Sequence, residues 1–216
     1  MASRIMHYTV AHIIAEKISI KDMNKFILGN LEPDLSHQDD GSYTVAHFIR
    51  KNNTLNTKGI DWVEFVQHYK ENILEDDEVL GYFVHLITDA WWIKNIRDKH
   101  IRKYSPEKRK ELTVKGYREM YRYNRVFIHK YQLKNTIYTI DSLKVNEAHI
   151  KYKDYLINEL VTDFAQNHIP NEVFEVYPYK DIMDFIELSV QKSINEIKAL
   201  RMNRPLSDPE EFYVDQ

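Results

Sequence analysis

Apolar residues recur along most of the chain at spacings of three and four, which is the period of an amphipathic α-helix. In the first such segment, the apolar residues from Ile5 to Ile18 fall roughly on one stripe. The same spacing predicts a short helix over 21–28 and the start of another over 44–50. Longer helices are predicted over residues 60–74, 78–104, 106–131, 147–166 and 179–202.

Capping and turn residues set the boundaries between these segments. Gly29-Asn30 fits the C-terminal cap of a helix, and Ser105-Pro106 fits an N-cap followed by Pro at the first helical position. Clusters of polar and turn-forming residues predict irregular structure between the helices. This covers loops over 31–43 and 51–59, an extended segment over 135–145, a break at Pro170 and an irregular C-terminal tail.

The chain of 216 residues contains only five Gly and six Pro, which favours long helices over many short strands. No repeat, low-complexity segment or linker divides it. We therefore expect one all-α, multi-helix bundle domain over residues 1–204, followed by a tail over 205–216. The absence of cysteine excludes disulfides and Cys-based zinc sites. A formal net charge of −3 provides no bulk attraction to nucleic acid or anionic membranes.

The N-terminal segment lacks the features of a signal peptide. Its short apolar stretch contains two His, ends in Glu-Lys and has no small-residue cleavage site. No run of 18 or more apolar residues occurs, so no membrane-spanning segment is predicted. We expect a cytoplasmic protein.

Candidate chemistry begins in the apolar stretch LGYFVHLITDAWW, where His85 and Asp89 lie one helical turn apart on the same face. Asp34 follows Pro33 in a loop, where the stiff backbone of proline suits a fixed ligand. Other segments supply His7 and His47. Imidazoles and carboxylates are ligands of Zn²⁺ and similar ions. The competing interpretation is a core His85 whose hydrogen-bonding needs are met by Asp89 or a main-chain carbonyl.

Four motifs together resemble the bacterial zinc-dependent phospholipase C family, whose fold is shared by zinc-dependent nucleases of single strands. In order, they are RIMHYTVAHIIAE, FILGNLEPDL, VAHF and GYFVHLITDAWW, and the resemblance covers roughly residues 4–100. The small members without a leader are the most similar. The resemblance implies a mostly helical fold with a three-metal cluster at the bottom of a cleft.

Matched by position, four residues correspond to the family's ligands of one metal: Asp34, His47, His85 and Asp89. The resemblance also implies that Asp89 bridges to another metal, which His7 helps to hold. In the relatives that metal is also bound by the mature N-terminus. Ala2 lies five positions before His7, as the terminal residue does in the nucleases, so removal of Met1 would make the Ala2 amine a candidate ligand.

The chain departs from the family pattern at the remaining metal. Asn95 stands where the relatives have a further His, and the later His-carboxylate pair is replaced by Asp154 and Asn158. His149 and Asp98 are alternative ligands. We expect two or three zinc ions, with one position that is empty or prefers Mn²⁺, Mg²⁺ or Ca²⁺ because its ligands are mostly oxygen.

The resemblance implies hydrolysis of a phosphoric ester by metal-activated water, with Asp34 also acting as general base. The expected substrate is a small phosphoester or a phospholipid headgroup, and the sequence does not indicate an oligomeric state. Lys94 and Arg97 could contact a phosphate, although such helical charges are usually solvated. The alternative function is a non-catalytic helical protein with a structural or sensing metal site.

The other histidines and aromatic residues are expected to be structural. His37 is the main rival of His47 as a ligand, and His12 lies on a different face from His7. Arg and Tyr alternate over residues 116–131, a composition that suits nucleic acid, but packing of an amphipathic helix explains it and we favour that. Trp91 and Trp92 are expected in the core. Surface positions are predicted for His68, His100, His129 and His168.

Overall fold

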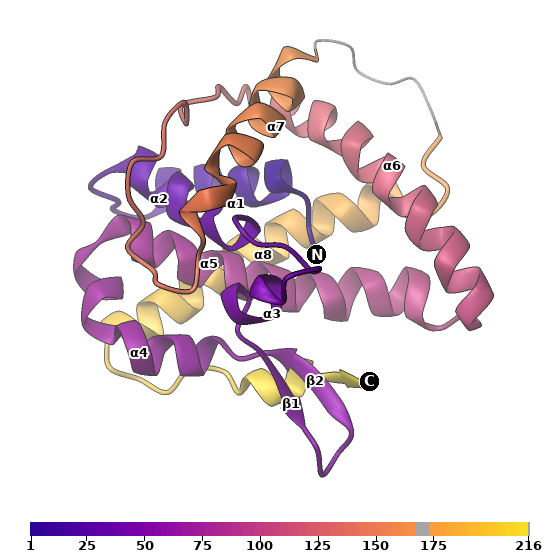
Figure 1. Ribbon diagram of the computed structural model, residues 1–216, viewed down its shortest axis with the longest axis horizontal. Coiled ribbons are helices and arrows are strands. Elements are labelled where there is room, and N and C mark those ends of the chain that lie inside the picture. Colours follow the sequence, from indigo (N-terminus) through magenta and orange to yellow (C-terminus); the bar gives the residue numbers. More distant parts are fainter. Residues whose placement is uncertain (167–172, 216) are drawn as a thin grey trace.

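The computed structural model describes residues 1–166 and 173–215, and its fold is mostly helical (Figure 1). Its α-helices are α1 (Arg4–Lys17), α2 (Met23–Gly29), α3 (Ser42–Ala46), α4 (Trp62–Glu75), α5 (Asp77–Trp92), α6 (Pro106–Lys130), α7 (Lys153–Ala165) and α8 (Tyr179–Arg201). Four further helical segments are η1 (Glu32–Asp34), η2 (Ile93–Arg102), η3 (Ile150–Tyr152) and η4 (Pro209–Phe212). The strands are β1 (Ile49–Asn52), β2 (Thr57–Ile60) and β3 (Val214–Asp215).

Side-chain caps explain where several helices begin. The hydroxyl of Ser3 accepts a hydrogen bond from the Met6 N–H at the start of α1. Asp76 caps α5 in the same way, and Ser105 caps α6 as its sequence predicts. Each cap satisfies one N–H that the first helical turn leaves without a partner.

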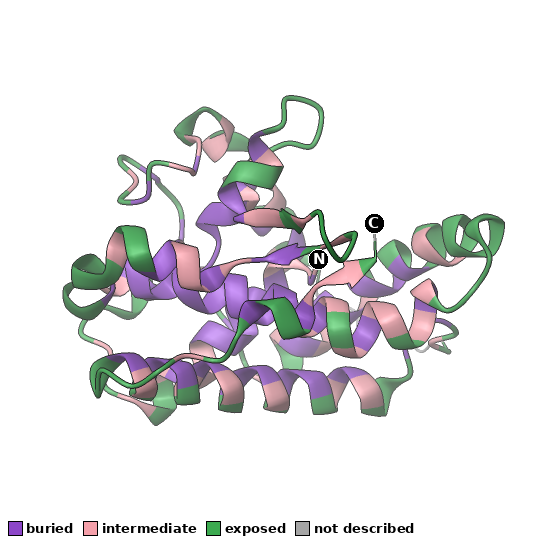
Figure 2. Cartoon of the chain, turned by 90° about the horizontal axis from the view of Figure 1, so that it is seen from below, coloured by how far each residue is buried: buried purple, intermediate pink, exposed green. Residues whose placement is uncertain are grey.

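Helix α5 forms the centre of the molecule and is buried on all sides. Every residue from Glu78 to Ala90 is buried. Figure 2 shows that the buried residues gather in the middle of the molecule. Helices α2, α4 and α8 pack against α5. A helix that is apolar around its whole circumference is stable only in such a setting. Any polar side chain on α5 is therefore placed in the core.

Two glycines allow α2 and α5 to approach closely. A Cβ atom at Gly81 would lie 2.1 Å from the carbonyl oxygen of Phe26, and one at Gly29 would lie 1.7 Å from that of Glu78. No larger side chain fits at either contact without a backbone shift. The approach brings Asn30, at the end of α2, against the middle of α5.

The long helix predicted over 78–104 is confirmed in extent, but its second half has a different register. Beyond Trp92 the chain continues as the π-helix η2, Ile93–Arg102. The wider i→i+5 turn changes the directions of the side chains relative to a continued α-helix. Simple α-helical spacing from Asp89 therefore does not predict which side chains of η2 face the centre.

The prediction of an all-α fold is right for most of the chain but wrong for residues 49–60, where β1 and β2 form an antiparallel hairpin. The predicted helix over 44–50 ends at Ala46 because Phe48 adopts a positive φ of 48°, which turns the chain into β1. No residue of β1 is buried, and β2 is buried only at its last two residues, Gly59 and Ile60, so the hairpin lacks the apolar alternation of a half-buried strand.

The C-terminal tail is ordered rather than irregular. Its strand β3 pairs with β2, and the preceding turn η4 buries Phe212. The ring of Phe212 packs edge-on against Trp62 and Trp91, with centroids 5.2 and 4.7 Å away. The tail therefore packs against the helical domain and completes its small sheet.

Two smaller differences concern the segments that precede α7. Residues 135–145 contain no strand in the described structure, although an extended segment is predicted there. The helix predicted over 147–166 starts late, as the turn η3 followed by α7. Pro170 lies outside the described residues. Among the described helices, none has both the length and the apolar character needed to cross a bilayer.

Candidate metal centre

Five of the predicted ligands meet at one place in the core. His7 comes from α1, Asp34 ends η1, His47 follows α3, and α5 supplies His85 and Asp89. Potential ligand atoms within 4.8 Å of one another form two overlapping groups: His7, His85 and Asp89, and Asp34, His47 and His85. These buried groups could hold metal ions.

Asp89 lies between the two groups. Its Oδ1 accepts a hydrogen bond from the Ala2 N–H at 2.8 Å and lies 3.2 Å from His7 Nε2. Its Oδ2 faces the other side, 3.4 Å from His85 Nε2 and 3.7 Å from His47 Nε2. A carboxylate with one oxygen directed to each group has the geometry of a bridging ligand.

Main-chain carbonyls fix which nitrogen of two imidazoles faces the centre. His85 Nδ1 lies 2.9 Å from the Asn30 carbonyl oxygen, and His47 Nδ1 lies 3.0 Å from that of Tyr43. A carbonyl only accepts, so both Nδ1 atoms donate, and in the neutral rings both Nε2 atoms carry lone pairs. These Nε2 atoms are 3.3 Å apart. Two facing lone pairs repel each other unless a proton or a metal ion lies between them.

The pKa values of the centre reflect this arrangement. Burial and the neighbouring His85 lower the pKa of His47 to about 4 and also lower that of His7. Burial acts in the same direction on His85, but the Asp89 carboxylate outweighs it and raises the pKa of His85. Burial opposes ionisation of Asp89, while His7 and His85 hold its pKa well below the usual range. The Asp89 carboxylate, 3.4 Å from His85 Nε2, therefore favours a proton on His85.

Several atoms of the centre lack a hydrogen-bond partner among the described residues. They include both ring nitrogens of His7 and the Oδ2 of Asp89, which are fully buried. Leaving such groups unsatisfied costs about 1–3 kcal/mol each. Of these atoms, His7 Nε2 lies 3.2 Å from the Asp89 carboxylate, and imidazole nitrogen and carboxylate oxygen are ligands that Zn²⁺ prefers. The residues therefore fit a metal ion.

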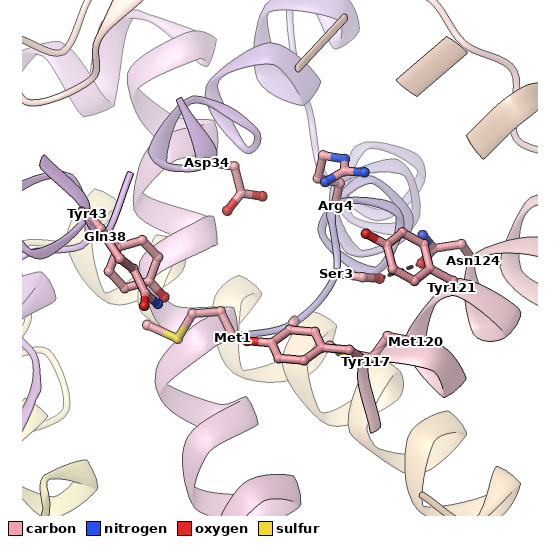
Figure 3. A pocket seen from close by; sticks show the side chains of 11 residues that line it. Met1, Ser3, Arg4, Asp34, Gln38, Tyr43, Tyr117, Met120, Tyr121 and Asn124 are labelled. Atoms are coloured by element: carbon pink, nitrogen blue, oxygen red, sulfur yellow. Dashed lines mark hydrogen bonds between the residues drawn. The ribbon is translucent and has the colours of Figure 1, made fainter. Parts of the chain in front are cut away.

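Asp34 is the ligand candidate that reaches solvent. Its side chain is 20% exposed, whereas the other four are fully buried, and its Oδ1 lies 3.9 Å from His47 Nε2. It lines a cavity of about 200 Å³ together with Ala2 and Tyr43. Figure 3 shows Asp34 and Arg4 around this cavity, with the Met1 side chain between Tyr43 and the opposite wall. A ligand in the cavity would meet the centre at Asp34.

A polar network fixes the chain between Ala2 and α1. Ser3 Oγ donates to Asn124 Oδ1 at 2.6 Å, and Asn124 Nδ2 donates to Asp163 at 3.1 Å. Arg4 forms ion pairs with Glu159 and Asp163 at 2.6 and 3.3 Å. These contacts join α1 to α6 and α7, so that Ala2 is held beside Asp89.

Other predicted ligands are not brought to the centre. Asp154 and Asn158 are exposed on α7, and Asp154 belongs to neither ligand group of the described chain. Asp98 pairs with Arg102 at 2.9 Å, and Asn95 donates to the Trp91 carbonyl. Two histidines also lie outside both groups: His149, whose N–H donates to the Leu35 carbonyl, and His37, which is exposed beside Asp39.

The remaining predictions on aromatic and basic residues are confirmed only in part. Trp92 is in the core as expected, and His12 lies apart from the centre, near Glu16. His100 is a correction: a surface position was predicted, but its side chain is only 12% exposed and pairs with Asp181 at 2.7 Å. His68 and His129 are exposed, and His168 lies outside the described residues.

One set of site residues was missed by the sequence analysis. Tyr117, Tyr121 and Asn124 line the cavity from α6, and both tyrosines are half exposed. Their spacing of four and three places them on one face of a helix, which is the signal that could have identified them. Tyr123 instead packs in the core, so one face of α6 lines the cavity and another contributes to the core.

Comparisons with known proteins do not assign the chain to a family. No model of a protein family matches the chain, and neither the curated proteins nor the solved structures include a significant match.

Zinc should stabilise the protein more at pH 8 than at pH 6. Because the pKa of His85 is raised in the folded state, His85 stabilises the metal-free fold at pH values below the unfolded-state pKa of histidine, about 6.5. This contribution is lost as the pH rises through the folded-state pKa of His85. Metal binding must displace that proton, which costs less at higher pH. The difference in unfolding free energy with zinc and with chelator should widen by up to about 1.4 kcal/mol per pH unit. A difference that is constant or shrinks with pH, followed by circular dichroism, would contradict this.

Proposed function

We propose that the protein is a metal-dependent phosphoric-ester hydrolase, similar to the zinc-dependent phospholipase C family in its chemistry. The proposal depends on the Nε2 atoms of His47 and His85, which main-chain carbonyls orient so that they lie 3.3 Å apart. Beside them, Asp89 directs one carboxylate oxygen to each ligand group. The resemblance of the sequence motifs supports the reaction type, and the cavity at Asp34 supports access for a substrate.

Two zinc ions account for the buried ligands. One would be held by Asp34, His47, His85 and the Oδ2 of Asp89, and the second by His7 and the Oδ1 of Asp89. A third ion at Asp154 and Asn158 is not part of the proposal, because both residues are exposed on α7. Because only His7 and Asp89 would hold the second ion, Ala2 and a substrate could supply its remaining ligands.

When bound, the metal ions supply Lewis acidity, which polarises a phosphoryl group and makes water more acidic. The chain itself supplies the base and the orientation. Asp34 is the carboxylate with access to the cavity, and it can accept a proton from an attacking water. Asp89 stays ionised because His7 and His85 lower its pKa, so it keeps both oxygens free of protons. Tyr43 stacks on His47, with ring centroids 4.0 Å apart, and holds that ring in place.

The cavity favours a small substrate. Its volume of about 200 Å³ accommodates a phosphate with a short attached group rather than a whole phospholipid. The tyrosines of its wall provide hydroxyl groups and ring faces for that attached group. We therefore propose a small phosphodiester or a lipid headgroup as the reacting part.

Replacing Asp34 by Asn should abolish most turnover of bis-p-nitrophenyl phosphate, by at least about 100-fold, because the amide cannot accept the proton. The amide oxygen keeps the size and position of a ligand, so the metal content should fall little. Asp39→Asn is the matched control, since Asp39 is in the same loop and 93% exposed. Full activity in Asp34→Asn would contradict the role of Asp34.

A non-catalytic metal site is the second candidate, because four of the ligand side chains are completely buried. Closed sites of this kind are typical of structural metals, whereas catalytic metals keep an open position. The same experiment separates the two functions. Bound metal without turnover in the unaltered protein would favour the structural or sensing site.

The main-chain nitrogen of Ala2 is proposed as a further ligand once Met1 has been removed. It lies 2.8 Å from Asp89 Oδ1, where it is now an amide that donates a hydrogen bond. As a free amine it would carry a lone pair beside His7. Two chains released from a fusion, one beginning at Met1 and one at Ala2, should differ by about tenfold or more in affinity for the more weakly bound zinc. Equal affinities in a zinc titration would exclude the amine as a ligand.

A further inference from the structure

A second, smaller cavity adjoins the one at Asp34. It is lined by eight residues: Met1, Trp92, Arg97, Ile101, Thr113, Tyr117, Met120 and Tyr177. Met1, Tyr117 and Met120 also line the first cavity, so the two are separated by shared side chains. Its volume of about 10 Å³ is near the minimum for a single water molecule.

Arg97 is a half-buried arginine whose guanidinium has no hydrogen bond or ion pair with the rest of the described chain. Its neighbours on η2 are paired, since Arg102 contacts Asp98 at 2.9 Å and Lys99 contacts Asp181 at 2.6 Å. Guanidinium groups that are partly withdrawn from water normally bind a carboxylate or a phosphate. Arg97 makes no such contact within the described chain, so its guanidinium is available to bind an anion from solution.

The same cavity includes another donor without a partner. Trp92 is completely buried, and its indole Nε1–H donates to no atom of the described residues. An indole N–H can only donate, so its partner must be an acceptor. Two residues with donors that are unpaired in the described chain, one charged and one neutral, thus line one small space, and no carboxylate is among its lining residues.

Arg97 lies beside the cavity at Asp34. The small cavity that Arg97 lines shares Met1, Tyr117 and Met120 with the cavity that Asp34 lines. An anion that spans both cavities could therefore contact the metal centre at one end and Arg97 at the other.

We propose that Arg97, assisted by the indole N–H of Trp92, forms an oxyanion subsite that binds the phosphate group of a ligand beside the metal centre. The proposal rests on the hydrolase function above, because the subsite selects the substrates of that site. Met1 lines both cavities. Its removal, which the proposed Ala2 ligand requires, would join the cavities and open a path from Asp34 to Arg97.

The ligand class follows from the donors. A guanidinium is a rigid planar group whose N–H donors fit two oxygens of one phosphate. A neutral amide or hydroxyl does not present two such anionic oxygens. A phosphoester whose phosphate carries at least two free oxygens matches this fork. Neutral esters and amides should not be retained by the subsite.

Inorganic phosphate tests the subsite without requiring turnover. Calorimetric titration of the zinc-loaded full chain should show phosphate binding, and Arg97→Gln should weaken it by about tenfold or more, as expected for the loss of a charge-assisted contact. Arg97→Lys keeps the charge without the fork and should give an intermediate affinity. Lys94→Gln is the matched control, because it removes the same charge from an exposed position of η2, and it should stay within about twofold of the unaltered protein.

Two results would overturn the proposal. One is phosphate binding in Arg97→Gln that equals the unaltered protein at the same zinc content, and the other is no phosphate binding by the unaltered zinc-loaded chain. Failure of the hydrolase function gives a different pattern. A protein that binds phosphate through Arg97 but hydrolyses no phosphoester keeps the subsite and loses the proposed reaction.

Discussion

The structure depends on how two imidazoles are held in its core. His47 and His85 each donate their Nδ1–H to a main-chain carbonyl, which directs both Nε2 atoms to one point where they lie 3.3 Å apart. The two lone pairs repel each other when both rings are neutral. Without a proton or a metal ion between them, this repulsion would destabilise the fold, because the site is fully buried from water. Asp89 supplies the negative charge that makes a cation stable between them.

The rest of the fold serves this constraint. Gly29 and Gly81 let α2 approach α5 until the Asn30 carbonyl reaches His85. The Tyr43 carbonyl, in α3, accepts a hydrogen bond from His47 Nδ1 just before the left-handed turn at Phe48. The ring of His7 stacks on His85 with centroids 3.7 Å apart. Each contact restricts an orientation that a binding site would otherwise have to establish when the metal arrives.

Much of this arrangement is predictable from the sequence, because it is carried by local rules. The spacing of four in α5 places His85 and Asp89 on one face, and the predicted cap at Ser105 marks the start of α6. The convergence of Asp34 and His47 on that face depends on tertiary packing. Only the motif resemblance predicted it, since neither spacing nor periodicity relates a loop to a distant helix.

The features that sequence reasoning missed have physical reasons. The hairpin of β1 and β2 lies at the surface, so its residues carry no apolar alternation. The register of η2 departs from the α-helix, which hides the direction of Arg97. The isolation of Arg97 and Trp92 is a property of what surrounds them in space. The exposed position of Asp154 and Asn158 likewise reflects where α7 packs, not the spacing within it.

The most direct test of this account is the metal content of the untagged protein after reconstitution with zinc, measured by plasma mass spectrometry. We predict two zinc ions per chain, with a clear loss in His85→Ala because His85 is a ligand of the first ion and its ring stacks on His7, a ligand of the second. His37→Ala, an exposed histidine outside both groups, should keep the full content. No zinc in the unaltered protein, or equal zinc in His85→Ala, would contradict the metal centre and leave His85 and Asp89 as a buried pair in a helical core.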